Sequence, residues 1–178
     1  TLLGEFGIPF NMPLKLDYWL NWFGNQTAAL DASFAAVEAN LVSGTVWNYT
    51  PDNRNHGGDG WNSEDLSLFS RDQQKEPTDI NSGARGWQGF VRPYPLAIAG
   101  EPQKVSFDRK TGLFELQFLG DPAIAAPTTL FVPTLQYPKG YRVTVSDGTF
   151  SQEITRQRLI YQQTPNAVQH TIRLERLT

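Results

Sequence analysis

A glutamate near the start of the sequence is the first residue that could perform chemistry. Leu2 and Leu3 predict a short apolar strand, and Glu5 follows them within Gly4-Glu5-Phe6-Gly7. The catalytic groups of β/α barrels lie at the C-terminal ends of the strands, so Glu5 is a candidate catalytic carboxylate. A strand-end glutamate that pairs with an arginine for structural reasons fits the position equally well.

An aromatic residue ends the next predicted strand, Gly44-Thr45-Val46-Trp47. The face of its indole could stack on the apolar side of a sugar ring while hydrogen bonds form around the rim of that ring. Trp47 could also simply cover a barrel core. All five tryptophans lie in the first half, at positions 19, 22, 47, 61 and 87, which suits a carbohydrate site there.

The polar segment from Asn48 to about Ile80 is longer than an ordinary connection, so it is a second place for function. A calcium-loop pattern could begin at Asp52, but Arg54 and His56 occupy liganding positions and cannot serve as anionic ligands. The sequence contains no nucleotide-binding glycine pattern and no G-x-S-x-G elbow. We therefore expect neither a metal site nor a cofactor.

The composition argues against a nucleic acid or an anionic membrane as partner, because the formal net charge is −3 and supplies no basic footprint. A neutral ligand fits better. Without cysteine there is no disulfide or thiolate chemistry, but this leaves the compartment open. The first residues lack the basic and apolar segments of a signal peptide, which favours an intracellular location, cytoplasmic or vacuolar, over secretion. Of two glycosylation patterns, the one at Asn25 matters only for a secretory protein, and a glycan on Asn48 would block the expected sugar site.

Two helices are expected to position these groups. Apolar residues at positions 30, 34, 37 and 41 share one helical face, with Thr27 or Asn25 as cap and Gly44 as stop. Asn81 or Ser82 could cap a second helix. The apolar face of that helix would comprise Ala84, Trp87, Phe90 and Val91, and Pro93 would end it.

The order of strand, helix, strand, long loop and helix corresponds to two βα units. Two units cannot close a domain, because buried parallel strands need neighbours on both edges and helices on both faces. We expect them to be the last two units of a (β/α)₈ barrel of about 250 residues. The other six units would come from a preceding segment or from a separate chain. A small α+β domain that stands alone is the alternative.

The residue pattern changes near Ala99-Gly100-Glu101-Pro102, which predicts two domains, residues 1–98 and 99–178. Alternating apolar and polar residues in the second domain predict about six or seven strands and no helix, as in an antiparallel β-sandwich. Asp147-Gly148 predicts a tight hairpin turn, and residues 108–112 predict a looser turn. The fold class is thus α/β followed by all-β, with strands expected at residues 114–118, 129–132, 141–145, 159–162 and 171–174.

Three motifs occur in order along the first half: Leu3-Gly4-Glu5-Phe6-Gly7-Ile8-Pro9, Trp47-Asn48-Tyr49 and Asp59-Gly60-Trp61-Asn62-Ser63-Glu64-Asp65-Leu66-Ser67. Together with Phe90-Val91-Arg92-Pro93-Tyr94-Pro95 and the trailing sandwich, they resemble glycoside hydrolase family 5. The chain looks closest to the fungal glucosylceramidase and sterylglucosidase-like members, which are relatives of endoglycoceramidases. The resemblance covers nearly the whole chain.

The resemblance implies a retaining β-glucosidase, in which Glu5 attacks the anomeric carbon and a second glutamate, about 5–5.5 Å away, protonates the leaving group. In the family this acid/base glutamate follows an asparagine on the fourth barrel strand, and no residue of this chain matches it. The chain is therefore expected to be inactive without the N-terminal portion of the enzyme. By the same resemblance, the substrate-binding residues are expected to be Trp47, Asn48, Tyr49, Asp59, Trp61 and Asn62.

The resemblance also favours a hydrophobic aglycone, a sterol or a ceramide, which would contact the protein. A wide apolar mouth could include Phe10, Met12, Trp19 and Trp22, unless these residues pack against the following helix. The alternative function is a non-catalytic carbohydrate-binding or interaction module built on the β-sandwich. Such a module would expose aromatic side chains there, but the second half contains no tryptophan.

Overall fold

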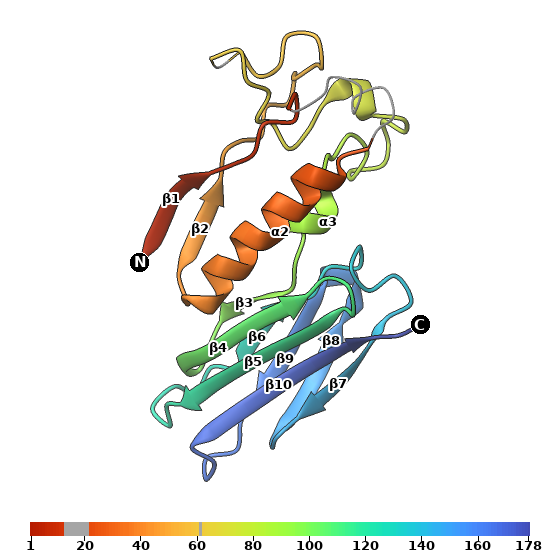
Figure 1. Ribbon diagram of the computed structural model, residues 1–178. Helices are drawn as coiled ribbons and strands as arrows, with labels where there is room; N and C mark the ends of the chain where they lie inside the picture. Colours follow the sequence, from red (N-terminus) through yellow and green to blue (C-terminus); the bar gives the residue numbers. More distant parts are fainter. Residues whose placement is uncertain (13–21, 61) are drawn as a thin grey trace. The chain divides into compact units, whose positions relative to one another are not determined.

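The computed structural model describes residues 1–12, 22–60 and 62–178. The chain divides into two compact units, whose elements are labelled in Figure 1. Unit 1 comprises Thr1–Phe34 and Val42–Phe90, and unit 2 comprises Ala35–Leu41 and Val91–Thr178. The sequence placed its division between residues 98 and 99. The observed division differs at two places, since unit 2 also takes Ala35–Leu41 and the segment that holds strand β3 (Tyr94–Ala97), which pairs with a strand of unit 2.

Unit 1 is built on a pair of parallel strands, β1 (Leu2–Phe6) and β2 (Ser43–Val46). Parallel strands need a long crossover, and helix α2 (Gly24–Ala39) lies in the connection between them. The ring of Phe6 packs edge-on against that of Phe34 in α2, with centroids 5.3 Å apart. Both strands and the first helix were thus predicted correctly in type and order.

The ends of α2 differ from the prediction. The helix begins at Gly24, so Asn25 and Thr27 lie within its first turn, and the Thr27 N–H bonds the Phe23 carbonyl at 2.8 Å. Neither residue is the cap. The helix ends at Ala39, and Leu41 reverses the chain with a φ of 51°. Leu41 is therefore exposed outside the helix, and Gly44 pairs with Leu3 inside β2 rather than stopping α2.

The second predicted helix is wrong over most of its length, since only Trp87–Phe90 is helical (α3). Gly83 and Gly86 have φ values of 93° and 62°, which are incompatible with a helix. A β-bridge between Phe69 and Ala84 and a bond from the Arg85 N–H to the Leu68 carbonyl at 2.8 Å hold this segment extended instead. A short 3₁₀ turn, η1 (Arg71–Gln73), precedes it. Long-range pairing has overridden the local apolar spacing.

Unit 2 contains the expected β-sandwich of two antiparallel four-stranded sheets (Figure 1). One sheet has the order β4-β5-β10-β7 and the other β3-β6-β9-β8. A 3₁₀ turn, η2 (Ile154–Arg156), lies between β8 and β9. The further strand bounds are Gly100–Asp108 (β4), Leu113–Gly120 (β5), Thr128–Phe131 (β6), Tyr141–Val145 (β7), Thr149–Glu153 (β8), Arg158–Gln162 (β9) and Gln169–Arg176 (β10). The described sandwich has eight strands rather than six or seven, and β3 holds Pro95 at a sheet edge, where proline is tolerated.

One of the two predicted turns is confirmed and the other has a different role. Residues 108–112 join β4 and β5 as antiparallel neighbours, and Gly112 adopts a φ of 73°. Asp147-Gly148 also turns sharply, with a φ of 69° at Gly148, but it joins β7 and β8, which lie in different sheets. The hairpin predicted there is therefore wrong, because positive φ at a glycine marks a turn without specifying which strands pair.

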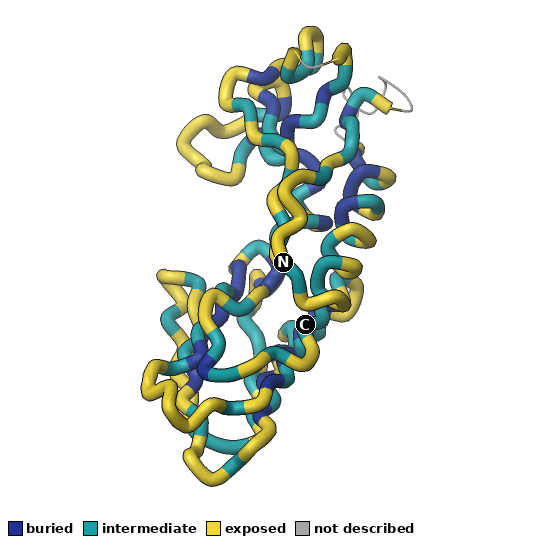
Figure 2. The backbone as a smooth tube through the Cα atoms, turned by 90° about the vertical axis from the view of Figure 1, so that its left-hand side faces the viewer, coloured by how far each residue is buried: buried dark blue, intermediate teal, exposed yellow. Residues whose placement is uncertain are grey.

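The core of unit 2 draws side chains from both sheets. Along β5, Phe114, Leu116 and Phe118 point inward and are fully buried, as their alternation predicted. Figure 2 shows short buried segments lying between intermediate and exposed segments along the backbone. The same core cluster includes Phe107, Leu130, Val132, Tyr137, Leu159, Tyr161, Ile172 and Leu174.

A buried polar cluster surrounds His170, whose side chain is fully buried. Its Nδ1 lies 2.8 Å from the Asp147 carboxylate and 3.2 Å from the Tyr161 hydroxyl. The Asp147 carboxylate also accepts bonds from the backbone and hydroxyl of Thr164, at 3.0 and 2.8 Å, and from Ser146 at 2.7 Å. Burial alone would raise the pKa of Asp147, but the bonds from Thr164, Ser146 and His170 outweigh it and hold this pKa well below its usual range.

Strong acid is therefore expected to weaken the sandwich through Asp147. Since its pKa is lower in the folded state, its stabilisation is complete above the unfolded pKa of about 3.9 and is lost as pH falls below that value. Asp147→Asn should lower the free energy of unfolding by about 2 kcal/mol at neutral pH and by less below about pH 3. Urea unfolding at both pH values measures this, with the exposed Asp121→Asn as control. An equal loss at both pH values would contradict the role given to Asp147.

Candidate active site

The candidate site begins at the edge where the two parallel strands of unit 1 end. Because β1 and β2 run in the same direction, Glu5 near the end of β1 and Trp47 just after β2 lie at the same edge. The Trp47 N–H donates to the Phe6 carbonyl at 2.7 Å, and the Thr45 hydroxyl donates to the Gly4 carbonyl. The Glu5 side chain is exposed, and 36% of Trp47 is exposed. The ends of β1 and β2 therefore bring an exposed glutamate and a partly exposed tryptophan to one edge of the strand pair.

Gly7 allows the chain after β1 to pass close to the end of β2. A Cβ atom at Gly7 would overlap the carbonyl oxygen of Trp47, whereas a Cβ at Gly4 would meet no atom within 4 Å. The peptide bond between Trp47 and Asn48 is cis. The glycine of the Glu5-Phe6-Gly7 motif is thus explained by contact with the second strand end.

Gly7→Ala is accordingly expected to displace the Trp47 backbone. The overlap should lower the free energy of unfolding by about 1–3 kcal/mol, since backbone cannot move aside as a flexible side chain does. Gly4→Ala, at the residue directly before Glu5, is the matched control and should be nearly neutral. Thermal unfolding of the two variants tests this, and equal stability of both would refute the close contact.

The side chains of Asn48 and Asp59 are in direct contact, which the sequence did not predict. The Asn48 amide donates to the Asp59 carboxylate at 2.9 Å, and the same carboxylate oxygen accepts the Leu66 N–H at 3.2 Å. The Asn48 Oδ1 accepts the Thr50 hydroxyl at 3.2 Å. The Asp59 carboxylate therefore links Asn48, the residue after Trp47, to Leu66 in the long loop.

The remaining predicted binding residues are more dispersed. Tyr49 is 67% exposed, and its ring lies 5.7 Å from that of Phe69, centroid to centroid. Asn62 is exposed, with a φ of 47°. Trp61 lies outside the described residues.

A buried ion pair organises the loop beneath these residues. Arg85 is fully buried, and its guanidinium donates two bonds to the Asp65 carboxylate, at 2.7 and 2.6 Å. It also donates to the Ser67 carbonyl, through Nε at 3.1 Å and through Nη2. The Asn53 amide donates to the same Asp65 carboxylate at 3.2 Å, and the guanidinium lies over the ring of Phe10, 4.4 Å from its centroid.

Sequence reasoning missed this network. Asp65 was noticed only as part of a motif, and Arg85 fell within the wrongly predicted helix. The two residues are 20 positions apart in irregular structure, so no helical or strand period links them. The one available signal was compositional, because a charge in an otherwise small and apolar segment, Gly83-Ala84-Arg85-Gly86-Trp87, requires a partner if the segment is buried.

The predicted apolar mouth is reproduced only in part. Phe10 is fully buried in a cluster with Phe23 and Leu30, which is the packing alternative. Met12 and Trp22 are more than half exposed, and Trp19 lies outside the described residues. Phe10 is therefore part of the core of unit 1 and does not line an open surface.

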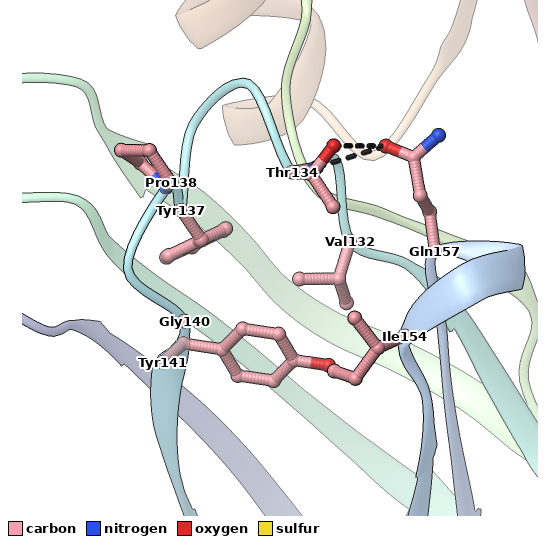
Figure 3. Close-up of a pocket in the computed structure, with 8 residues that line it drawn as sticks. All are labelled: Val132, Thr134, Tyr137, Pro138, Gly140, Tyr141, Ile154 and Gln157. Carbon is pink, nitrogen blue, oxygen red and sulfur yellow. Dashed lines mark hydrogen bonds between the residues drawn. The ribbon is translucent and has the colours of Figure 1, made fainter.

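Within residues 1–12, 22–60 and 62–178, no group of three or more histidine, aspartate or glutamate side chains could hold a metal ion. None of the helices in that part of the chain has the length and apolarity needed to cross a membrane. A small pocket of about 130 Å³ lies in unit 2, where Tyr141 and Ile154 face each other and Gln157 bonds Thr134 (Figure 3). None of the predicted site residues lines this pocket.

Comparison with known proteins gives the following matches. Residues 92–174 match the model of the glycoside hydrolase family 5 C-terminal domain. A glucosylceramidase from Rhizopus delemar is 31% identical over 164 residues, which cover 85% of this chain and 24% of that protein. An ergosteryl-β-glucosidase from Saccharomyces cerevisiae is 27% identical, over 83% of this chain and 27% of that protein. A crystal structure of sterylglucosidase 1 from Cryptococcus neoformans superposes with a TM-score of 0.87 and 28% identity, over 99% of this chain and 29% of that chain. The chain thus spans less than a third of the length of these relatives.

Proposed function

Because residues 92–174 form a glycoside hydrolase family 5 C-terminal domain, we propose that the chain is the C-terminal part of a retaining β-glycosidase. The resemblance inferred from the sequence motifs is confirmed by this match and by the glycosidase relatives. The observation that carries the proposal is the position of Glu5, exposed at the C-terminal edge of two parallel strands, the edge at which Trp47 also lies. Unit 1 would supply the catalytic part, and the sandwich of unit 2, which includes β3, would support it.

In the proposed reaction Glu5 is the nucleophile. Its carboxylate bonds to the anomeric carbon as the glycosidic bond breaks, and a second carboxylic acid gives its proton to the departing oxygen. That second group, now a carboxylate, takes a proton from water, whose oxygen displaces Glu5 and releases the sugar with its configuration retained. Trp47 would support the apolar face of the sugar, and Asn48, Tyr49, Asp59, Trp61 and Asn62 would line the binding region.

The strand pair supports the proposal that more barrel structure covers it. Leu2 and Leu3 are 61% and 45% exposed although they are apolar strand residues. A two-stranded parallel sheet leaves both outer edges unpaired, whereas such strands occur in sheets covered on both faces. We propose that the remaining strands and the acid/base glutamate come from an N-terminal portion of the same enzyme, on a preceding segment or a second chain.

The proposed substrate is a β-glucoside with a hydrophobic aglycone. The relatives are named for glucosylceramide and ergosteryl glucoside, and this chain has a net charge of only −3, which suits a neutral sugar. The exposed Met12 and Trp22 in unit 1 offer apolar surface for a lipid group.

The proposal is tested with the complete enzyme and three β-glucosides, those of a sterol, of ceramide and of a simple phenol. We expect hydrolysis of the lipid glucosides, and proton NMR should show β-glucose as the first-formed product. Release of α-glucose first would exclude the retaining mechanism. Hydrolysis of the phenyl glucoside without the lipid glucosides would exclude the proposed aglycone class.

A further inference from the structure

The buried Asp65–Arg85 pair takes no part in the chemistry proposed above, yet it is bonded to the segment beside Trp47. The Arg85 guanidinium donates hydrogen bonds to both the Asp65 carboxylate and the Ser67 carbonyl. The Ser67 hydroxyl accepts the N–H groups of Thr50, at 3.0 Å, and Phe69, at 3.2 Å. The ion pair is therefore linked through Ser67 alone to Thr50, which lies three residues after Trp47.

The residues on either side of Ser67 bond Asn48, the residue directly after Trp47, through both its N–H and its carbonyl. The Asn48 N–H donates to the Leu66 carbonyl at 3.3 Å, and the Asn48 carbonyl accepts the Leu68 N–H at 2.9 Å. Residues 65–68 thus form an extended segment that lies against residues 48–50, with Arg85 fixed to its other side. A displacement of this segment would move Asn48, and Trp47 with it.

The burial and geometry of the Asp65–Arg85 pair suit it to fix the segment that contains Ser67, and we call this pair the anchor. Both side chains are almost fully buried, with 0% of Arg85 and 2% of the Asp65 side chain exposed, so water does not compete for the bonds. The planar guanidinium makes a two-point contact with the carboxylate that a lysine ammonium cannot reproduce. The rings of Phe10 and Phe23 pack against the guanidinium, with centroids 4.4 and 5.9 Å away. These contacts give the anchor a single geometry.

We propose that Arg85 is a positioning residue for the sugar site, acting through Asp65 and Ser67 on Asn48 and so on the indole of Trp47. The inference rests on the proposed glycosidase function, in which Trp47 supports the sugar ring. It assigns to Arg85 a role in affinity for the sugar that is separate from its contribution to folding.

The test is a double-mutant cycle in the complete enzyme, read out as the dissociation constant of a glucose-shaped iminosugar inhibitor. Arg85→Lys should weaken binding by about tenfold to a hundredfold, the cost of misplacing a group by about 1 Å. Trp47→Ala should also weaken binding. In the Trp47→Ala background, however, Arg85→Lys should change the dissociation constant much less than in the wild-type background, because most of its effect passes through the indole. The Michaelis constants for a phenyl glucoside should follow the same pattern.

Two further variants separate positioning from a general loss of structure. Ser67→Ala keeps the ion pair but removes the acceptor for the Thr50 N–H, so it should weaken inhibitor binding clearly in the wild-type background and much less in Trp47→Ala. Arg54→Met breaks an ion pair with Asp72 in the same loop, 3.1 Å long and 60% exposed at the arginine, and should leave the dissociation constant unchanged. If Arg85→Lys does not fold, the Ser67→Ala cycle still decides the question.

Equal effects of Arg85→Lys, or of Ser67→Ala, with and without Trp47 would overturn the inference, because a residue that only stabilises the fold acts in both backgrounds. Failure of the glycosidase proposal would look different. In that case the parent enzyme itself would hydrolyse no β-glucoside and bind no iminosugar, whereas failure of the positioning role leaves the parent fully active.

Discussion

Replacing Glu5 by glutamine in the complete enzyme is expected to abolish turnover of β-glucosides, with a fall in kcat of about 10⁴-fold or more. The amide is nearly isosteric with the carboxylate but cannot form the glycosyl ester, so the covalent step is lost while the strand geometry stays. Because Glu5 is exposed on β1, the substitution should leave the free energy of unfolding almost unchanged. Steady-state kinetics on a phenyl β-glucoside and thermal unfolding together measure both parts.

A matched control is available in unit 1. Glu76 is exposed, and its carboxylate accepts bonds from the backbone and hydroxyl of Thr78 at 3.2 and 2.8 Å. Glu76→Gln removes the same charge from the same unit and should leave kcat within about twofold of the parent. Normal turnover by Glu5→Gln would show that the carboxylate at the strand edge is structural, which is the alternative that its position alone left open.

The second large effect is expected at Asp65. Asp65→Ala should lower the free energy of unfolding by about 3–5 kcal/mol, because it leaves the Arg85 guanidinium buried without its carboxylate. The Asn53 amide, which donates to the same carboxylate at 3.2 Å, also loses a partner. Urea unfolding of the complete enzyme measures the change, and the stability loss should be confined to unit 1 when followed by hydrogen exchange.

The exposed pair in the same loop supplies the comparison. Arg54→Met removes an ion pair between groups that are 60% and 35% exposed, and should cost at most about 1 kcal/mol. The contrast comes from desolvation, since only the buried pair has given up its hydration. A cost for Asp65→Ala no larger than that for Arg54→Met would mean that water reaches the Arg85 site.

Local sequence pattern predicted those parts of the fold that local physics controls. Phe114, Leu116 and Phe118 alternate with polar residues, and a sheet with one buried face requires this alternation. The turn at residues 108–112 was likewise predictable because its glycine and its aspartate serve the turn itself, with Asp108 accepting the Lys110 N–H at 2.8 Å. These elements need no distant partner to be specified.

Elements that depend on distant contacts could not be predicted in this way. Asp147-Gly148 turns the chain between two sheets, because β7 pairs with the distant strand β10 whereas β8 pairs with β9 in the other sheet. The apolar spacing of residues 84–91 resembles a helix, but Gly83 and Gly86 hold positive φ and Arg85 is drawn to Asp65. Tertiary contacts decided the outcome in both places.

The candidate site shows the same division. The common edge of Glu5 and Trp47 follows from two consecutive parallel strands, so sequence reasoning could reach it. The bond between Asn48 and Asp59 and the anchor at Arg85 depend on how an irregular loop closes, for which the sequence offers no period. The loop was recognised as functional by its length, while its internal bonds became evident only in three dimensions.

The central claim is tested most directly by covalent trapping with 2-deoxy-2-fluoro-β-glucosyl fluoride. The complete enzyme should become inactive with one fluoroglucosyl group per molecule, because the fluorine at C2 slows both steps while the fluoride leaving group speeds only formation of the glycosyl-enzyme. Peptide mass spectrometry should then place the group on Glu5, as an ester of its carboxylate. Recovery of the label on any other residue would contradict the assignment of Glu5 as the nucleophile.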